Sequence, residues 1–287
     1  MPWTENPKVV DLRRSSRIVD AVVETLDGFR RHLTGRNAAL VTYYGFLTLF
    51  PLFLAASTIL GFVLESRPEL REDLVDSAAA QIPFIGNQLG GELTGSWVAL
   101  VVGLSVALWG SMKAFIGLQI SYDDIWEVEL DDRSTFVTQR GRALIGLAVI
   151  GGAQIATVAL SSVVAEAGLP GYSQWLLVLG GLVINVAVVA AMYRFLTTFD
   201  VTWAMVWPGA LFAGALYSII QFFGTRITAA LARNDTYGNF STVLALLTWL
   251  SLHAIINLFG GEINAALHRI GVRTTPADAE PAPSAAH

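Results

Sequence analysis

The chain has 287 residues, of which 54% are hydrophobic and 14% are charged, and its net charge is −5. A soluble domain of this length carries about 25% charged residues, so too few polar groups are present to cover a water-exposed surface. The absence of cysteine excludes disulfides, thiolate metal ligands and thiol nucleophiles. The four histidines are widely scattered, so we expect neither a metal site nor a cofactor.

The N-terminal region is polar. We expect residues 1–14 to form a flexible cytoplasmic segment and residues 15–36 to form an amphipathic cytoplasmic helix. Two interpretations of this helix remain open. It lies on the anionic inner leaflet, with Arg30, Arg31 and Arg36 at the membrane surface, or it packs against the cytoplasmic end of the bundle. Its apolar stripe consists of Ile18, Val22, Leu26, Phe29 and Leu33.

Residues 37–268 are predicted to form a transmembrane domain, because long apolar intervals free of charge divide the chain. About 20 apolar residues are needed to cross a hydrocarbon core of about 30 Å. Helices satisfy their own backbone hydrogen bonds in lipid, so the expected fold is an all-α bundle of six transmembrane helices. The predicted spans are 38–64, 96–118, 142–165, 174–197, 203–224 and 240–267.

The basic residues predict the orientation of these spans. With the N-terminus inside, thirteen Lys and Arg residues lie in inner segments and four lie in outer segments. This positive-inside bias predicts a multi-pass protein of a bacterial inner membrane with both termini in the cytoplasm. Residues 269–287 end in a Pro- and Ala-rich stretch, which predicts a disordered cytoplasmic tail.

Small residues and one proline recur within the spans. Small side chains let transmembrane helices approach closely, so we interpret these positions as sites of helix packing. They are Pro51, Gly103, Gly110, Gly117, Gly214, Gly260 and Gly261.

Polar residues also lie in each of the spans. A single polar stripe is explained by helix packing, but stripes in nearly every helix favour a shared polar cavity through which a solute could pass. The candidates for this cavity are Tyr44, Thr48, Lys113, Gln154, Asn185, Gln221, His253, Asn257, Glu262 and Asn264.

The sixth span has polar groups on opposite faces. His253, Asn257 and Asn264 share one face, and Glu262 points away from His253, so this helix should lie centrally among the others. Lys113 and Glu262 should lie at similar depth. They form an ion pair or, alternatively, both extend to the cytoplasmic interface. His253 is a hydrogen-bonded core histidine or a proton relay.

Several enzyme classes have no motif in this chain. No nucleotide-binding loop, zinc protease motif, nucleophile elbow or metal-dependent nuclease cluster is present, so we assign no catalytic residue. The basic N-terminus is explained by topology, and nucleic acid is not an expected partner.

Five segments of the spans and their flanks form an ordered set of motifs. They are 39–52 (ALVTYYGFLTLFPL), 208–215 (PGALFAGA), 237–240 (YGNF), 247–250 (LTWL) and 260–265 (GGEINA). Together they resemble the YihY/BrkB family of bacterial inner-membrane proteins. Thr48 stands in the first segment where the family pattern has Ser, and Ser241 and His253 are local departures from the pattern in the last span.

The resemblance implies six helices and cytoplasmic termini. It also brings the legacy label ribonuclease BN, for which the residues of this chain give no chemical reason. The leading hypothesis is permease-like transport of a small solute or lipid through the polar cavity. The alternative is an envelope scaffold that binds lipid or protein partners without transport, and a membrane-anchored ribonuclease ranks last. The sequence does not determine the oligomeric state.

Overall fold

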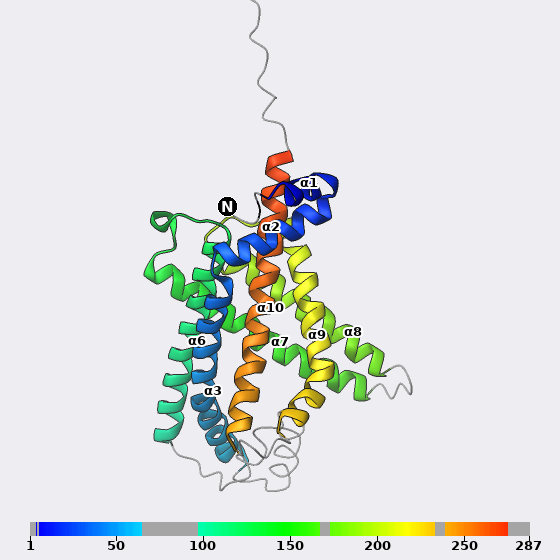
Figure 1. Cartoon of the computed structure of the whole chain (residues 1–287). Helices are drawn as coiled ribbons and strands as arrows, with labels where there is room; N and C mark the ends of the chain where they lie inside the picture. Colours follow the sequence, from blue (N-terminus) through cyan, green and yellow to red (C-terminus); the bar gives the residue numbers. More distant parts are fainter. Residues whose placement is uncertain (1–3, 5, 65–96, 167–172, 233–238, 275–287) are drawn as a thin grey trace, which may run out of the picture.

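The computed structural model describes residues 4, 6–64, 97–166, 173–232 and 239–274. Within these ranges all regular structure is helical, which confirms the all-α fold class (Figure 1). A 3₁₀ turn at Leu130–Asp132 lies between α6 and α7. The α-helices are α1 (Pro7–Ser15), α2 (Arg17–Arg31), α3 (Thr34–Leu64), α6 (Trp97–Ile125), α7 (Phe136–Glu166), α8 (Ser173–Phe195), α9 (Trp203–Ala232) and α10 (Asn239–Thr274).

Six long helices, α3 and α6 to α10, lie where the sequence predicts the six spans. Within the described residues, four helices contain stretches long and apolar enough to cross a membrane. These stretches are Leu100–Ile125, Trp175–Phe195, Trp203–Gln221 and Val243–Arg273. Helices α3 and α7 include residues whose side chains lie outside the described part, so the count of six spans stays a prediction.

Helix α10 is the centre of the bundle. It packs against α2, α3, α6 and α9, and Figure 1 shows it upright among them. Its polar residues are almost fully enclosed, since Asn257 is 4% exposed, Glu262 is 0% exposed and Asn264 is 2% exposed. The sequence predicted this central, enclosed position, because the sixth span has polar groups on opposite faces.

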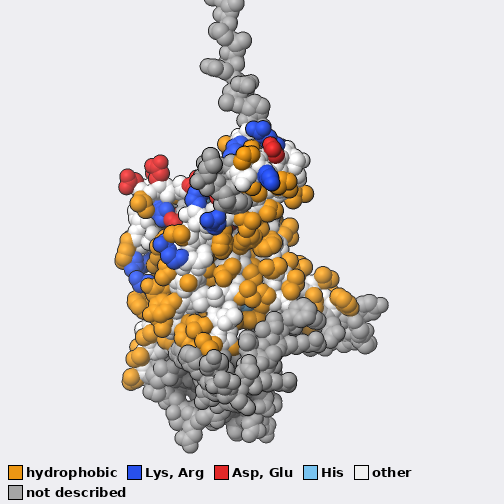
Figure 2. Space-filling model, viewed as in Figure 1, with side chains coloured by type: hydrophobic (Ala, Val, Ile, Leu, Met, Phe, Trp, Pro, Cys, Tyr) orange, Lys and Arg blue, Asp and Glu red, His pale blue; other side chains and the backbone are white. Residues whose placement is uncertain are grey.

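The other helices form two groups around α10. Helices α3 and α6 run beside it, whereas α7 and α8 slant away as a pair and connect to the bundle mainly through α9 (Figure 1). In Figure 2 the charged side chains gather toward the end that carries α1 and α2, and hydrophobic side chains cover most of the flank below. We call the end that carries α1, α2 and the last turns of α10 the capped end.

Glycines set the closest helix crossings. A Cβ on Gly209 of α9 would overlap the backbone carbonyl of Gly260 of α10, so any larger residue would separate these helices. A Cβ on Gly110 would lie 2.6 Å from Oγ1 of Thr48, and one on Gly214 would lie 2.9 Å from the backbone nitrogen of Val186. Close contact of small residues is the usual means by which helices associate in lipid.

The N-terminal region differs from the expectation of a flexible segment followed by one helix. Residues 7–15 form α1, which begins with Pro7 in its first turn, and the Asn6 side chain accepts a hydrogen bond from the backbone N–H of Lys8. Helix α2 ends at Arg31, and Leu33 has a φ of 52° in the turn that leads into α3. At the other terminus α10 continues to Thr274, so residues 269–274 of the predicted tail are helical, and residues 275–287 lie outside the described part.

Helix α2 packs through its polar face. Glu24 and Thr25 are 3% and 4% exposed, whereas the apolar side chains of Ile18 and Val22 are 77% and 53% exposed. Phe29 is the member of the apolar stripe that packs inward, with its ring 5.7 Å from that of Phe259. A helix with this arrangement is attached to the protein by polar contacts and presents its apolar stripe outward.

Candidate functional site

A cavity of about 470 Å³ lies inside the bundle. All six long helices contribute to its lining. Ligand pockets in proteins commonly enclose about 300–1,000 Å³, so this cavity has the volume of a small-molecule site. None of the described residues that line it is Asp, Glu, Lys or Arg.

Five of the cavity candidates predicted from the sequence line this space: Thr48, Asn185, Gln221, His253 and Asn257. The Thr48 hydroxyl donates to the Tyr44 carbonyl oxygen of its own helix at 2.7 Å. The Asn185 amide donates to Oε1 of Gln221 at 3.1 Å and to Oγ of Ser218 at 3.1 Å. The bonds of Asn185 join α8 to α9 at the cavity wall, so these polar groups both support the helices and line the cavity.

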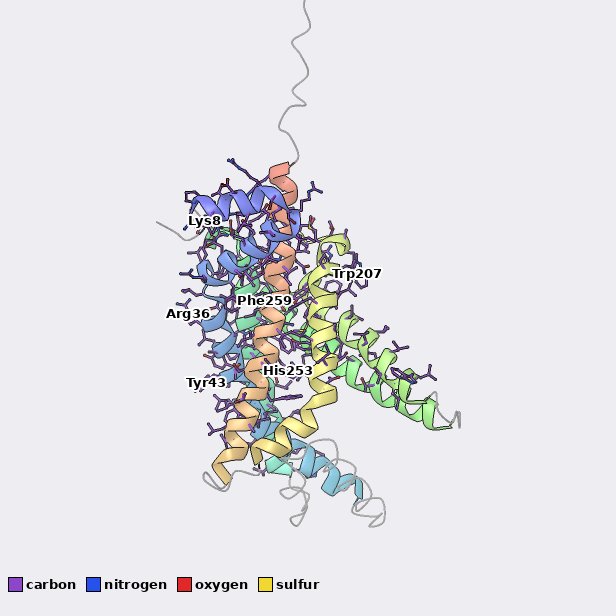
Figure 3. All side chains as sticks on the ribbon, turned by 45° about the vertical axis from the view of Figure 1, so that its right-hand side comes forward. Lys8, Arg36, Tyr43, Trp207, His253 and Phe259 are labelled. Carbon is purple, nitrogen blue, oxygen red and sulfur yellow. The ribbon has the colours of Figure 1, made fainter. Side chains whose placement is uncertain are left out.

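His253 is held between two aromatic rings. Its ring lies 4.9 Å from that of Tyr217 in a stacked arrangement and 4.7 Å from that of Trp249. Its Nδ1 atom is 2.9 Å from the Trp249 carbonyl oxygen, and the Tyr217 hydroxyl donates to the His253 carbonyl oxygen at 2.9 Å. Figure 3 shows His253 on α10, at the side where α9 lies. The imidazole therefore has one orientation in the cavity.

Tyr122 and Tyr193 form a layer next to the cavity, on the side of the capped end. The Tyr122 hydroxyl donates to Oδ1 of Asn257, and the Tyr193 hydroxyl donates to the Asn257 carbonyl oxygen at 2.5 Å. The two tyrosine rings meet edge to face at 5.5 Å. Residues from α6, α8 and α10 are thus fastened together one helical turn beyond His253.

Glu262 lies beyond this layer, outside the cavity, and belongs to a buried polar cluster. Its Oε1 accepts a hydrogen bond from Oγ1 of Thr34 at 2.7 Å and lies 2.9 Å from Nδ1 of His32. Its Oε2 is 3.9 Å from Nη2 of Arg269. The sequence did not single out His32 or Thr34, because it predicted one continuous helix over 15–36. In the structure His32 lies in the turn after α2, and Thr34 is the first residue of α3.

Glu24 of α2 continues the cluster. Its carboxylate is 2.8 Å from Nη2 of Arg13, 3.1 Å from Nε of Arg269 and 3.1 Å from Nη1 of Arg273. Burial alone would raise the pKa of Glu24, but the ion pairs with Arg273, Arg269 and Arg13 outweigh burial and hold the pKa below its ordinary value of 4.5. Arg31 also reaches Glu24, at 3.7 Å.

We call Glu24, His32, Thr34, Glu262 and Arg269 the buried cap. These residues join α2, the start of α3 and α10 at the capped end. Glu127, after α6, adds an outer ion pair to Arg31 at 3.1 Å and lies 3.5 Å from Nη1 of Arg269. Separating α2 from α10 would leave charges without partners, which is costly in a buried site.

The Lys113–Glu262 ion pair considered from the sequence is not formed in the structure. Glu262 is held by the buried cap, and Lys113 is half-buried with its Nζ 5.9 Å from the ring centre of Trp109. Equal depth in the membrane does not place two side chains on facing sides of their helices. The spacing of residues along the chain gives no information on which sides of two helices face each other.

The remaining predicted residues have structural positions. The Asn264 side chain accepts from the Gly209 backbone N–H at 2.6 Å and donates to the Val206 carbonyl oxygen at 3.2 Å, which ties α9 to α10. Tyr44 is half-buried, with its ring 5.3 Å from that of Tyr43, and does not line the cavity. The Gln154 side chain lies outside the described part.

The predicted packing positions are spread over the helix contacts. Gly103 is buried and Pro51 lies within α3. The nearest neighbours of a Cβ would be Val41 at 3.6 Å for Gly117 and Ile125 at 3.5 Å for Gly261, both ordinary contacts. At Gly260 a Cβ would overlap the Tyr193 hydroxyl, so this glycine, like Gly110 and Gly214, permits a close approach.

The predicted membrane-surface arginines have different surroundings. Arg30 and Arg36 are exposed and pair with no carboxylate of the described residues, and Figure 3 shows Arg36 at the outer side of the bundle. Arg31 instead pairs with Glu127. In the acidic segment, Asp123 is buried and accepts hydrogen bonds from Oγ1 of Thr197 at 2.9 Å and from the Thr198 backbone N–H at 2.7 Å.

Comparison with known families decides the relationship of this chain. The model of the family described as virulence factor BrkB matches residues 25–285, which is nearly the whole sequence. The chain belongs to the BrkB family. It is therefore an integral membrane protein of a family that includes the inner membrane protein YhjD of Escherichia coli, with which it shares 23% identity over 273 residues.

Other relatives of this chain carry different names. The putative ribonuclease-like protein YfkH of Bacillus subtilis is 23% identical over 269 residues, which cover 86% of this chain and 94% of YfkH. The UPF0761 membrane protein PSHAa0171 of Pseudoalteromonas translucida is 29% identical over 135 residues, 46% of this chain and 45% of that protein. The alignment with YhjD covers 84% of this chain and 79% of YhjD. No solved structure matches the chain.

Proposed function

We propose that this BrkB protein is a permease-like carrier that binds an uncharged small solute or lipid in the cavity and moves it across the inner membrane. In this proposal the capped end faces the cytoplasm, as the distribution of Lys and Arg predicts. The observation that carries the proposal is a central cavity of about 470 Å³ with amide, imidazole and hydroxyl groups and no charged side chain among its described lining residues.

The lining selects for uncharged solutes. Transfer of an ion into a site of low dielectric constant is strongly unfavourable unless a charge of opposite sign is close. The cavity supplies no such charge from its described residues. It does offer hydrogen-bonding groups at Asn185, Gln221, His253 and Asn257 beside apolar surface from residues such as Leu49 and Leu250. An uncharged solute with polar and apolar parts fits this combination.

The buried cap is proposed to be the barrier on the cytoplasmic side. The tyrosine layer around Asn257 and then the contacts of Glu262 lie in succession along α10, between the cavity and the capped end. Passage of a solute to the cytoplasm requires these contacts to separate. The arrangement described here is then a state that is closed at the capped end.

Two glycines allow the cavity to be filled with little disturbance of its walls. Gly45 of α3 and Gly181 of α8 both line the cavity, and a Cβ on either would meet no heavy atom within 4 Å. Gly152 of α7 is exposed, has the same free space and does not line the cavity. Gly181→Phe is therefore a blocking variant, and Gly152→Phe is its matched control.

The test uses the full chain in lipid vesicles. Osmotic swelling measures entry of glycerol, and dithionite quenching measures transbilayer movement of a lipid that carries a nitrobenzoxadiazole group on its acyl chain. We expect the wild type and Gly152→Phe to accelerate one of the two processes and Gly181→Phe to abolish the acceleration. Acceleration of neither process by the wild type, or equal rates in the two variants, would refute this proposal.

A second candidate function, an envelope scaffold that binds lipid, is favoured by one specific observation. Helix α2 is attached through Glu24 and Thr25 and leaves Ile18 and Val22 exposed. Exposed apolar side chains beside exposed arginines such as Arg30 suit the interface of an anionic membrane, where each cation near the surface contributes about 1 kcal/mol.

The absence of cysteine makes this second candidate easy to test. Ile18→Cys with a nitroxide label should report contact with oxygen dissolved in lipid and protection from an aqueous nickel relaxant. The exposed Asp11 position, as Asp11→Cys, is the aqueous control. A scaffold should lose cellular function in Ile18→Glu while its vesicle assays stay unchanged. A label at position 18 that is fully open to the nickel relaxant would contradict the lipid contact.

A further inference from the structure

The hydrogen bond of His253 decides which ring nitrogen carries the proton. The Trp249 carbonyl oxygen can only accept, so Nδ1 of His253, 2.9 Å away, must be the donor. In a neutral imidazole the other nitrogen, Nε2, is then an acceptor. The stacked ring of Tyr217 and the neighbouring ring of Trp249 keep the imidazole from turning over. His253 therefore presents a fixed acceptor.

His253 lines the cavity, and none of the described residues forms a hydrogen bond with its Nε2. The neighbouring polar groups are partly occupied. Asn257 uses its Oδ1 to accept from Tyr122, and Asn185 uses its amide N–H groups toward Gln221 and Ser218. The Asn257 side chain, one turn along α10 from His253, also forms a hydrogen bond with the Tyr217 hydroxyl, so its amide is occupied as well. Of these two residues, His253 is the one that offers a free acceptor to a ligand.

Apolar residues line the cavity beside these polar groups. Leu49, Ile184, Val188 and Leu250 contribute aliphatic surface to the same cavity. A solute that uses both parts has a hydroxyl-bearing end and an aliphatic body. A carboxylate or a phosphodiester has no proton to donate to Nε2, and no Lys or Arg is among the described residues of the lining to neutralise any anion. An ammonium could donate, but no described lining residue is a carboxylate.

We infer that the cavity binds an uncharged aliphatic alcohol or polyol ester, whose hydroxyl donates to Nε2 of His253 and whose chain lies against the apolar wall. The inference deepens the proposed function and rests on it for the identity of the cavity as the transport site. His253 is then the residue that determines specificity for a hydroxyl. The bond to Trp249 and the two aromatic rings are what prepare it for this role.

Nitrogen-15 NMR of the histidine side chains tests the inference directly. The full chain in lipid nanodiscs is labelled with 15N-histidine, and its four histidines are assigned by single substitutions. Three probes with the same acyl chain are compared: monodecanoylglycerol, which has hydroxyls, methyl decanoate, which has no donor, and decanoate, which is charged. We expect monodecanoylglycerol alone to shift the Nε2 resonance of His253, which without probe should be that of an unprotonated acceptor.

Substitution provides a second, independent measurement. His253→Phe keeps a stacked ring and removes the acceptor, so its affinity for monodecanoylglycerol should fall about 2- to 10-fold, the effect of one hydrogen bond. Its affinity for methyl decanoate should not change. His268→Phe is the matched control, because His268 lies outside the cavity, 5.7 Å from the rings of Trp126 and Phe199.

The outcomes separate the two proposals. An unshifted His253 resonance with every probe, a stronger response to decanoate, or equal affinities in His253→Phe and wild type would overturn the inference. Such a result, with glycerol or lipid movement still blocked by Gly181→Phe, would leave transport standing without this specificity. Hydroxyl-dependent shifts with no movement in vesicles would establish the binding site and refute transport.

Discussion

Gly28 of α2 is the position at which the buried cap can be disturbed by a single methyl group. A Cβ at Gly28 would lie 2.5 Å from Oε2 of Glu262, 3.3 Å from its Cδ and 3.1 Å from Nη2 of Arg269. Cβ atoms in proteins essentially never approach other heavy atoms within 3.0 Å. In Gly28→Ala either α2 moves away from α10 or the carboxylate of Glu262 moves away from its partners.

The expected loss of stability in Gly28→Ala can be estimated from the contacts of Glu262 that would be broken. A displaced Glu262 carboxylate loses a hydrogen bond to Thr34 or His32, and bonds to charged groups contribute about 1.5–3 kcal/mol. Replacing a helical glycine by alanine returns about 1 kcal/mol. We therefore expect Gly28→Ala to lower the free energy of unfolding by about 0.5–2 kcal/mol.

The matched control is Gly141→Ala in α7. Gly141 is exposed and its Cβ would meet nothing within 4 Å, so the same substitution should stabilise the protein by about 0.5–1 kcal/mol. Titration of purified protein in mixed micelles with sodium dodecyl sulfate measures both variants. The two changes should have opposite signs. A Gly28→Ala protein as stable as the wild type would show that the cap is not packed as described.

Three further predictions concern the polar and close contacts of the bundle. Burial alone would raise the pKa of Glu24, but its arginines hold the pKa below the ordinary 4.5. The stability that ionised Glu24 contributes is therefore complete above pH 4.5 and is lost as the pH falls through the lowered pKa. Thermal unfolding at pH 7 and pH 3.5 should show that the wild type loses more stability than Glu24→Gln. Lys113→Ala and Glu262→Gln should have additive effects on stability, within about 0.5 kcal/mol, because these residues form no pair; a coupling energy above about 1 kcal/mol would reinstate the pair. Gly209→Ala should lower stability by about 1–3 kcal/mol, since its Cβ overlaps the carbonyl of Gly260, and an increase in stability would contradict the crossing.

The positions of the long helices could be predicted closely from the sequence. The span predicted at 174–197 is α8, Ser173–Phe195, and the span predicted at 203–224 starts with α9 at Trp203. Burial of backbone groups in lipid leaves a long apolar segment no alternative to a helix, so a local property decides the element. The polar stripe of α10 also predicted its central position, because an enclosed helix is the arrangement that satisfies polar groups on two faces.

The partners of the polar residues could not be predicted in the same way. The period of 3.6 residues grouped His253, Asn257 and Asn264 on one face of the last span. In the structure His253 and Asn257 line the cavity, whereas Asn264 bonds to α9. The partner of Glu262 was not found, because it depends on the rotation of α10 relative to α2 and α3 and on a turn at Leu33. Similar predicted depth in the membrane made Lys113 a candidate partner of Glu262, but depth does not say which way each side chain points around its helix.

The sequence by itself determined that this chain is a helical membrane protein, where its long helices lie and which residue types could form a polar interior. The tertiary structure alone decided that Thr48, Asn185 and His253 meet around one cavity while Glu262 is held in a separate cap under α2. The apolar pattern of each helix is local to its own sequence. The rotation of a helix about its axis and its distance from its neighbours depend on how several helices pack together. Contacts at glycines such as Gly28 and Gly209 establish that fit.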